Sequence, residues 1–493
     1  MSLIDEAYNA DRFENLSKIW QRLLAEHLTT MLSGDSPVLN WQDPAQAVAT
    51  AESFLMSGPD SAAKRQQQFS GLLNQMLASG QNLHNPRYIG HQVPASVPIA
   101  GLFDAVGSVT NQPMAIYEMG PWATAVEHAL SRVLCRKVGW NPDTSSGVLT
   151  HGGSLANLTA LLTARNVRLP NCWEAGTPRN AVLIAQADAH YCVTRAAGIL
   201  GLGTKQIIKV PVDDRRRMSS TELNRSLEAC RRDGRTVIAV AAAACATPIG
   251  AFDPLSEIAD VCEQHGVWFH VDAAHGGGLL MSSQHRHKLD GIDRADSVVW
   301  DAHKMLFMPA LCAAVLYRDK THQFDAFQQD APYLFDPSNP GMAEFDNGTR
   351  TVECTKRPIG FGLWGLWSMF GETIFEQMVD RSIALAKYVH QQLEAAADFE
   401  TCHQPECNIV VFRHLPQSIA HASAEEQNQF QQQLRTRLVR SGEFYIVQTK
   451  LDGKACLRLT VMNPTTTEAD LDSLLDAIGR TAESFASQSL AAE

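Results

Sequence analysis

The sequence predicts an α/β protein whose main domain is a mostly parallel sheet covered by helices on both faces. Three observations predict this fold. Between residues 85 and 385, short apolar runs alternate with segments of helical spacing, the order expected for parallel strands with crossover helices. Before this region the pattern is mostly helical. After it, a strand, a hairpin signal and a last helix indicate a small α+β domain.

The N-terminal segment, residues 1–84, is predicted to be helical. Leu23, Leu24, Leu28 and Met31 recur at helical spacing, and the run 33–37 (SGDSP) breaks the pattern. Such a segment cannot bury its apolar face alone. We therefore expect it to pack on another domain or on a second subunit, as a dimerisation segment.

The large domain, residues 85–385, contains the candidate strands of the sheet. A predicted helix, Pro254–Gln264, separates two of them. The candidate strands are Ala181–Ala185, Gln206–Val210, Val237–Ala244, Val267–Val271, Ser297–Trp300 and Ala313–Tyr317.

The small C-terminal domain, residues 386–493, has a different pattern. Asn408–Phe412 reads as a strand, and Asp452-Gly453 is a hairpin turn signal between Phe444–Thr449 and Ala455–Val461. The stretch Thr467–Phe485 is predicted to be a closing helix with Thr467 as its N-cap.

Composition excludes several classes of protein. With 45% hydrophobic and 19% charged residues the chain is globular rather than disordered, and its net charge of −12 disfavours a nucleic-acid or anionic-membrane partner. The longest apolar run, Val237 to Cys245, is far too short to span a bilayer. No secretory signal is visible at the N-terminus, and eleven scattered cysteines without a Cys-x-x-Cys pair favour a reduced, cytoplasmic location.

Two chemically distinctive residues follow two of the candidate strands. Asp272 directly follows the apolar run 266–271. After the second run, Ser297–Trp300, the chain continues with Asp301, Ala302, His303 and Lys304. Because ligands of open α/β sheets bind at the carboxyl edge of the strands, we expect both side chains at one site. An amine that forms an imine and a carboxylate that keeps a ring nitrogen protonated are the two groups that pyridoxal phosphate (PLP) requires. Apolar neighbours of Lys304, residues 305–308, predict a lowered pKa for its amine.

A third element is suited to a phosphate. The run 150–158 (THGGSLANL) combines glycines, a hydroxyl and the start of a helix, so that amides near Gly153 and Ser154 would bind an anion, although a plain Ser N-cap is the simpler interpretation. His190 follows another strand, where its imidazole would stack on an aromatic cofactor or be a half-buried structural histidine. Thr247 and Asp253 follow the Val237 strand in the same way. Glycines 276–278 would let the backbone approach a ligand closely.

The remaining histidines do not predict a metal site. His285 and His287 stand two residues apart with no third ligand in sequence range, so we interpret them as a solvated surface and expect no metal.

The ordered motifs resemble the group II PLP-dependent amino-acid decarboxylases, a family that includes glutamate, cysteine-sulfinate, diaminobutyrate and aromatic amino-acid decarboxylases. The resemblance runs from about residue 85 to residue 464. The motifs are Gly152-Gly153-Ser154-x-Ala156-Asn157, Ala189-His190, Thr247-x-x-Gly250-Ala251-Phe252-Asp253-Pro254-Leu255, His270-Val271-Asp272-Ala273-Ala274, Ala295-Asp296-Ser297-x-x-x-Asp301-x-His303-Lys304 and Arg458-x-x-x-x-Asn463-Pro464.

The resemblance implies a fold type I architecture with a seven-stranded sheet, and a homodimer with active sites at the subunit interface. It also implies residue roles. Lys304 would bond to the PLP aldehyde and Asp272 would pair with the ring nitrogen. His190 and Ala274 would cover the two ring faces, and Thr247 would lie near the ring hydroxyl. Gly153, Ser154 and His303 would contact the phosphate, and Arg458 would hold the substrate carboxylate. Asn111, Gln112 and Glu118 match a segment lining the dimer-interface site.

This chain departs from the family pattern at three places. Asp301 stands where Asn is common, and a carboxylate there would repel the phosphate unless it turned away, were screened or acted through its backbone. Cys245-Ala246 replaces the usual Gly-Thr. Residues 336–345 contain no tyrosine, whereas several members carry on this loop the tyrosine that returns a proton to Cα. The loop's prolines and glycine still indicate a lid.

The predicted reaction is α-decarboxylation of a small acidic or diamino L-amino acid, such as glutamate, aspartate or 2,4-diaminobutyrate. His91 would neutralise a distal carboxylate, or Glu118 would bind a distal amine. The alternatives are another PLP reaction, such as transamination or decarboxylation coupled to aldehyde formation, and a non-catalytic binding protein of the same fold.

Overall fold

The computed structural model describes residues 2–56, 58–327 and 344–490, with side chains up to 484. The chain divides into two compact units, which are described separately. Unit 1 comprises Met1–His91, Gln391–Cys402 and Val411–Glu493, and unit 2 comprises Gln92–His390 and His403–Val410. The domain boundaries expected at 84/85 and 385/386 stay predictions.

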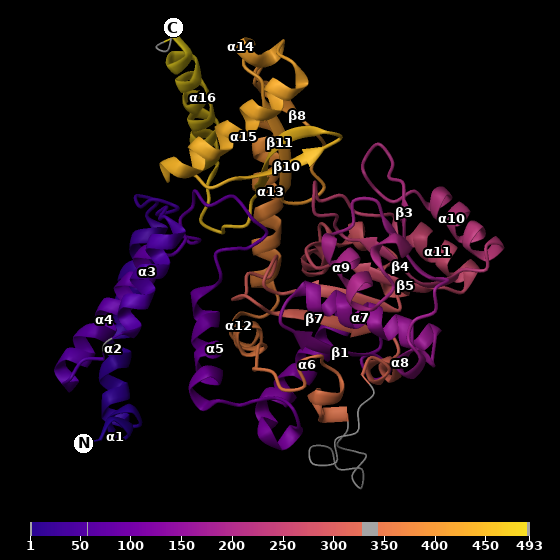
Figure 1. Cartoon of the computed structure of the whole chain (residues 1–493), viewed down its shortest axis with the longest axis horizontal. Coiled ribbons are helices and arrows are strands. Elements are labelled where there is room, and N and C mark those ends of the chain that lie inside the picture. The colour runs from indigo at the N-terminus through magenta and orange to yellow at the C-terminus, as the bar shows by residue number, and fades with distance from the viewer. Residues whose placement is uncertain (1, 57, 328–343, 491–493) are drawn as a thin grey trace. The chain divides into compact units, whose positions relative to one another are not determined.

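Unit 2 is built on a seven-stranded sheet in the order β1-β7-β6-β5-β4-β2-β3 (Figure 1). The five adjacent strands β6, β5, β4, β2 and β3 are parallel to one another. Strand β7 is antiparallel to both of its neighbours, β1 and β6. The predicted fold class, α/β with a large and mostly parallel sheet, is confirmed. The strands are β1 (Ser146–Thr150), β2 (Ala181–Gln186), β3 (Ile207–Val210), β4 (Thr236–Ala243), β5 (Trp268–Asp272), β6 (Ser297–Asp301) and β7 (Ala313–Tyr317).

The register brings the ends of distant strands level with one another. Thr150 and Asp301 both pair with Ala313 of β7, so β1 and β6 run parallel and end at the same height. Ala243 pairs with Asp272 on the other side. The carboxyl ends of β1, β4, β5 and β6 therefore share one edge of the sheet.

Both faces of the sheet are buried, as the sequence predicted. Leu183 and Ala239 pack into a hydrophobic cluster with α7 and α9, while the alternating residues Ile184 and Val240 are equally buried on the opposite face. The helices and 3-10 helices of unit 2 are α5 (Pro98–Thr110), η1 (Tyr117–Met119), α6 (Pro121–Val138), α7 (Gly153–Arg168), α8 (Cys172–Ala175), α9 (Tyr191–Ile199), η2 (Thr204–Gln206), α10 (Ser220–Arg232), α11 (Leu255–His265), η3 (Gly276–Met281), η4 (Arg286–Leu289), η5 (Ile292–Arg294), η6 (Lys320–Phe324), η8 (Asn347–Thr349) and α12 (Phe361–Phe370). Most of α13 (Thr373–Ala395) also belongs to unit 2, and its last residues, 391–395, are assigned to unit 1.

Unit 1 combines the N-terminal helices with the C-terminal sheet. The helices are α1 (Leu3–Ala7), α2 (Ala10–Leu32), α3 (Pro44–Leu55), α4 (Ala62–Ser79), α14 (Gln417–Ala420), α15 (Ala424–Ser441) and α16 (Glu468–Leu490). A four-stranded sheet has the order β10-β11-β9-β8, with β8 (Phe399–Thr401), β9 (Ile409–His414), β10 (Val447–Leu451) and β11 (Lys454–Thr460). The first two residues of β9 are assigned to unit 2. The hairpin predicted at Asp452-Gly453 joins β10 to β11.

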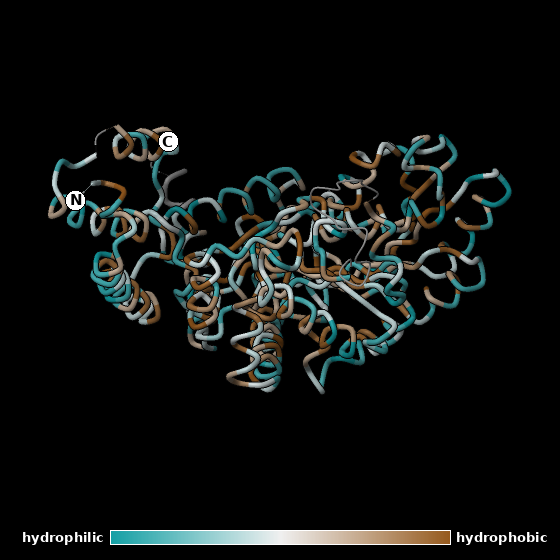
Figure 2. The backbone as a smooth tube through the Cα atoms, turned by 90° about the horizontal axis from the view of Figure 1, so that it is seen from below, coloured by the Kyte–Doolittle hydropathy of each residue, from teal (hydrophilic) through white to brown (hydrophobic). Residues whose placement is uncertain are grey.

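The helices carry hydrophilic and hydrophobic residues on alternating parts of their turns (Figure 2). This is the pattern of helices that bury one face and expose the other. In the described ranges of the chain, no helix combines the length and the apolar character that a membrane span requires.

Candidate active site at the carboxyl edge of the sheet

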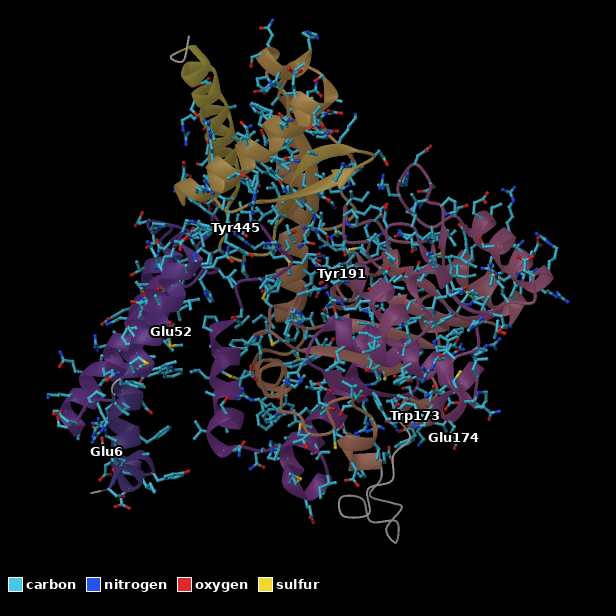
Figure 3. All side chains as sticks on the ribbon, viewed as in Figure 1. Glu6, Glu52, Trp173, Glu174, Tyr191 and Tyr445 are labelled. Atoms are coloured by element: carbon cyan, nitrogen blue, oxygen red, sulfur yellow. The ribbon has the colours of Figure 1, made fainter. Side chains whose placement is uncertain are left out.

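Residues from four strand ends meet at this edge. α7 begins directly after β1, His190 follows β2, Asp272 ends β5, and Asp301 ends β6 three residues before Lys304. Tyr191, labelled in Figure 3, marks the start of α9 next to His190. Asp272 and Asp301 both act electrostatically on Lys304, so the amine lies within range of both carboxylates.

Asp272 is held by two donors. The amide of Ala274 donates to Oδ1 at 3.1 Å, and the thiol of Cys192 donates to Oδ2 at 3.8 Å. Burial and the nearby carboxylate raise the pKa of Cys192, so the sulfur keeps its proton and remains a donor. These two donors fix the orientation of the Asp272 carboxylate, and Cys192 is a contributor that the sequence did not single out.

Lys304 is paired rather than isolated. Its Nζ lies 3.3 Å from Oδ2 of Asp301, and 20% of its side chain is exposed. Burial alone would lower the pKa of the amine, but the charges of Asp301 and Asp272 outweigh it and raise the pKa. The predicted lowering of the pKa was therefore wrong, because the neighbours of the amine in space are carboxylates whereas its neighbours in sequence are apolar.

Asp301 points into the site. Its carboxylate is 1% exposed and lies between Lys304 and the imidazole of His303, whose Nε2 is 3.7 Å away. Burial raises the pKa of Asp301, and Lys304 and His303 only partly oppose this effect. Oδ1 has no hydrogen-bond partner among the described residues. Of the three possibilities raised from the sequence, screening is the one that the structure shows.

The start of α7 is shaped for an anion. Its N-cap is Gly152, at φ 101°, and no side chain caps the helix, so the alternative of Ser154 as a plain N-cap was wrong. Ser154 is exposed in the first turn. At Gly153 a Cβ would come within 2.6 Å of Oδ2 of Asp301, so only glycine leaves this space open. The first amides of a helix lack partners inside the helix and favour an anion.

A buried chain of hydrogen bonds connects β5 to the first residue of α7. Nε2 of His270 bonds to Oδ1 of Asn157 at 2.9 Å, and Nδ2 of Asn157 donates to the carbonyl of Gly153 at 2.9 Å. Nδ1 of His270 bonds to Oγ of Ser297 at 2.8 Å. Burial lowers the pKa of His270 to about 4, so the ring is neutral and fits this chain of bonds. The only signal in the sequence was one histidine inside an apolar strand.

His190 forms the N-cap of α9. Its Nδ1 accepts from the amide of Cys192 at 3.4 Å, and its half-buried ring lies 4.1 Å from that of Tyr191, centroid to centroid. Burial lowers the pKa of His190, and Asp272 only partly restores it. His303 is fixed through Nδ1, which lies 3.0 Å from the carbonyl of Cys312.

Thr247 is half-buried in the turn after β4, and Ala274 is buried. Asp253 is structural: its carboxylate accepts from the amides of Ala243 and Met218, each at 2.7 Å. The expectation for glycines 276–278 was wrong. They belong to the buried helix η3, and protein atoms rather than a ligand fill the space beside them.

The candidate substrate residues belong to different units. Arg458 and His91 lie in unit 1, where Nη1 of Arg458 donates to Oγ1 of Thr460 at 3.0 Å and Nε2 of His91 lies 3.2 Å from the hydroxyl of Tyr445. Burial, Arg458 and Arg435 lower the pKa of His91. In unit 2, Glu118 and Asn111 are exposed and Gln112 is half-buried.

The expected lid falls mostly outside the described residues, because positions 336–343 are not described. At its end, the ring of Phe345 lies 4.8 Å from that of His128, centroid to centroid. His285 lies 4.0 Å from Asp380, and this pair is not part of any group of three metal ligands in the described part of the chain.

The donor set fits PLP. An amine, a carboxylate held by two donors and an open helix start occupy one edge of an α/β sheet, and the buried Asp301 is a group whose charge opposes a phosphate. These features define an α/β enzyme of the PLP-dependent class.

Comparison with known proteins shows to which family of PLP-dependent enzymes the chain is similar. The family model described as "Pyridoxal-dependent decarboxylase conserved domain" matches residues 57–415. Cysteine sulfinic acid decarboxylase of Mus musculus is 31% identical over 93% of this chain and 94% of its own length. Acidic amino acid decarboxylase GADL1 of Bos taurus is 33% identical over 75% of this chain and 72% of its length. The crystal structure of mouse CSAD superposes with a TM-score of 0.89 at 29% identity, covering 96% of this chain and 99% of that one.

The chain belongs to the pyridoxal-dependent decarboxylase family and is a PLP-dependent amino-acid decarboxylase of fold type I. The resemblance seen in the sequence is confirmed, and the alternative of a non-catalytic binding protein was wrong.

Proposed function

We propose that this enzyme removes the α-carboxylate of a small acidic L-amino acid and releases the corresponding amine. The observation that carries the acidic choice is a group of cations in unit 1: Arg458 and Arg435 both act electrostatically on His91. Both relatives described above are named for acidic substrates. Glu118, the residue expected to bind a diamino acid, is exposed and supports that choice less well.

We assign Lys304 the covalent attachment of PLP and Asp272 the partner of the ring nitrogen. When bound, PLP supplies an aldehyde that condenses with amines and a cationic ring that accepts the electron pair released with CO₂. Asp272 would pair with the protonated ring nitrogen, and the amide of Ala274 and the thiol of Cys192 hold its carboxylate in place. Lys304 must lose a proton before it can act as a nucleophile.

The other residues position the cofactor. Gly153 and Ser154 would offer the first amides of α7 to the phosphate, and His303 would contact the same group. His190 and Ala274 would cover the two faces of the ring, and Thr247 would lie near the ring hydroxyl. These assignments rest on the family motifs together with the shared sheet edge.

Substrate recognition falls to unit 1 residues. Arg458, buried on β11 and bonded to Thr460, holds the α-carboxylate. His91 is neutral at physiological pH because its pKa is lowered, so it donates a hydrogen bond to a distal acidic group instead of pairing with it as a cation.

We further propose a cytoplasmic homodimer with active sites at the subunit interface. Residues Ile99, Leu102, Val106 and Val109 line one side of α5 and are 37–62% exposed. An apolar stripe of this length is typical of a face covered by another subunit. All eleven cysteines lie among the described residues and none of them forms a disulfide there, which fits a reducing compartment.

The test is a panel of amino acids with the purified, PLP-loaded enzyme: aspartate, glutamate, cysteine sulfinate, 2,4-diaminobutyrate and an aromatic amino acid. We expect CO₂ and amine from an acidic member. Turnover confined to the diamino or aromatic substrate would overturn the substrate proposal. Aldehyde and ammonia in place of amine would favour the second reaction, which the absence of tyrosine from residues 336–345 motivates.

A further inference from the structure

Three potential metal ligands meet in the interior of unit 2, outside the site described above. Cys245 follows β4, His275 follows β5, and Cys407 immediately precedes Asn408 and β9. Their ligand atoms all lie within 4.8 Å of one another. The exposed fractions are 7%, 2% and 0%, so all three are buried. Within the described residues this is the only such group of three.

The separation of the two sulfurs suits a shared ion. Sγ of Cys245 lies 3.8 Å from Sγ of Cys407. With zinc–sulfur bonds of about 2.3 Å, a tetrahedral site places two sulfurs about 3.8 Å apart. A disulfide would require about 2.05 Å.

The surroundings hold two of the ligands in place. Nε2 of His275 bonds to Oδ1 of the fully buried Asn408 at 2.8 Å, and bonds of this kind orient metal-binding histidines. The backbone of Gly250, at φ +76°, packs against the thiol of Cys407. Sγ of Cys407 lies 3.6 Å from the carbonyl oxygen of Gly250. The cluster is therefore arranged before any ion arrives.

We propose that Cys245, His275 and Cys407 bind one zinc ion. Binding breaks two S–H bonds, releases two protons to solvent and forms two zinc–sulfur bonds and one zinc–nitrogen bond, with no change of oxidation state. Two thiolates and an imidazole are borderline-soft ligands that favour zinc over magnesium or calcium. The fourth position is left for a further donor such as water.

The ion would connect three separate segments, two of which also carry residues assigned to the cofactor site. Cys245 stands two residues before Thr247, and His275 directly follows Ala274. Cys407 belongs to the stretch 403–410, which joins unit 2 from elsewhere in the sequence. Because metal binding to the folded chain adds to folding stability, the zinc ion would hold the exits of β4 and β5 in place.

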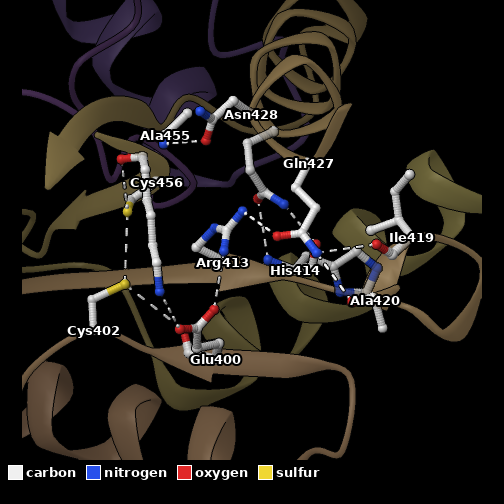
Figure 4. Close-up of polar contacts among 12 residues, drawn as sticks. Glu400, Cys402, Arg413, His414, Ile419, Ala420, Gln427, Asn428, Ala455 and Cys456 are labelled. Carbon is white, nitrogen blue, oxygen red and sulfur yellow. Dashed lines mark hydrogen bonds and ion pairs between the residues drawn. The ribbon is translucent and has the colours of Figure 1, made fainter. Parts of the chain in front are cut away.

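A second thiol pair in unit 1 provides a matched control. Sγ of Cys402 lies 3.7 Å from Sγ of Cys456, and the two side chains face each other in Figure 4. No third ligand completes a group there in the part of the chain that the structure describes. This pair has the same sulfur spacing without the histidine.

The experiment measures zinc in the full-length, PLP-loaded enzyme by mass spectrometry of the metal after dialysis against a zinc buffer. Wild type and Cys402→Ser are expected to hold about one zinc per chain. Cys407→Ser and His275→Asn are expected to lose at least about tenfold in zinc affinity. Removing zinc should lower the melting temperature of wild type and leave that of Cys407→Ser unchanged.

Three results would overturn the proposal: a wild type that binds no zinc, equal zinc in Cys407→Ser and wild type, or a mass lower by two hydrogens from a disulfide between Cys245 and Cys407. If Cys407→Ser fails to fold, the proposal is tested instead by adding cobalt to the zinc-free wild type and recording its absorption spectrum. A thiolate-to-cobalt charge-transfer band supports the site, and its absence contradicts it.

Discussion

Two carboxylates end neighbouring strands of the same sheet, and their surroundings differ. Asp272 at the end of β5 receives an amide and a thiol, both uncharged donors. Asp301 at the end of β6 faces the ammonium of Lys304 and leaves one oxygen without a hydrogen bond among the described residues. The comparison shows that two acidic residues at equivalent strand ends can differ in role, because their hydrogen-bond and charge partners differ. Asp272 is held by neutral donors, which suits its proposed role opposite the ring nitrogen, whereas Asp301 forms an ion pair with the ammonium of Lys304.

The largest expected effect comes from the amine that both carboxylates share. Lys304→Ala should lower kcat by on the order of 10³-fold or more, because covalent attachment of PLP is lost. Activity assays and the visible absorbance of bound PLP check this result, with the exposed Lys205→Ala as control. An alanine variant that retained PLP after borohydride treatment and gel filtration would contradict the assignment.

The next effect tests the first carboxylate. Asp272→Asn keeps the shape of the side chain but cannot hold the ring nitrogen protonated, so kcat should fall on the order of 10²- to 10³-fold. Steady-state kinetics should show little change in KM, and the exposed Asp233→Asn should behave as wild type. A normal kcat would show that the two carboxylates are not distinguished in the way proposed.

The second carboxylate should respond in the opposite direction. Asp301→Asn removes a negative charge beside the phosphate position, so PLP should bind more tightly, on the order of tenfold. It also removes one of the two carboxylate charges that raise the pKa of Lys304, the other being that of Asp272.

A lower pKa gives more neutral amine at a given pH. The midpoint of the pH dependence of PLP association, measured by stopped-flow absorbance, should therefore move to lower pH in Asp301→Asn. Weaker binding of PLP, or a midpoint moved to higher pH, would refute the contrast between the two residues.

The smallest effect concerns the thiol that supports Asp272. Cys192→Ala removes one hydrogen bond of about 1 kcal/mol, so kcat should fall about fivefold. Cys192→Ser restores a donor and should recover most of the activity, which a purely steric role of the sulfur would not explain. Equal kcat values in the alanine and serine variants would rule out the hydrogen bond as the cause.

The sequence predicted the fold and the principal pair because both depend on local patterns. Apolar runs identify the parallel strands, and parallel strands place Asp272 and Lys304 at the same edge. The antiparallel hairpin around Asp452-Gly453 was predictable for the same reason.

Contacts between distant residues were not predictable. Cys192 and Asp272 are 80 positions apart, and His270 and Asn157 are 113 positions apart. No periodicity encodes such pairs, because packing of whole helices on the sheet creates them. The error about the pKa of Lys304 has the same origin, since its apolar sequence neighbours gave no sign of the carboxylates in space. Ser154 was misassigned as the N-cap of α7, because the N-cap is Gly152, two residues earlier.

The glycine run after Asp272 limits how this gene can vary. A methyl group at Gly276 would come within 2.6 Å of the carbonyl oxygen of Ala244, one at Gly277 within 2.8 Å of Trp300, and one at Gly278 within 2.5 Å of Met305. Each neighbour belongs to a segment that also carries a residue of the active site or of the thiol cluster. Single substitutions in this run would therefore disturb catalysis as well as stability, and only coordinated changes at two positions offer a route for divergence.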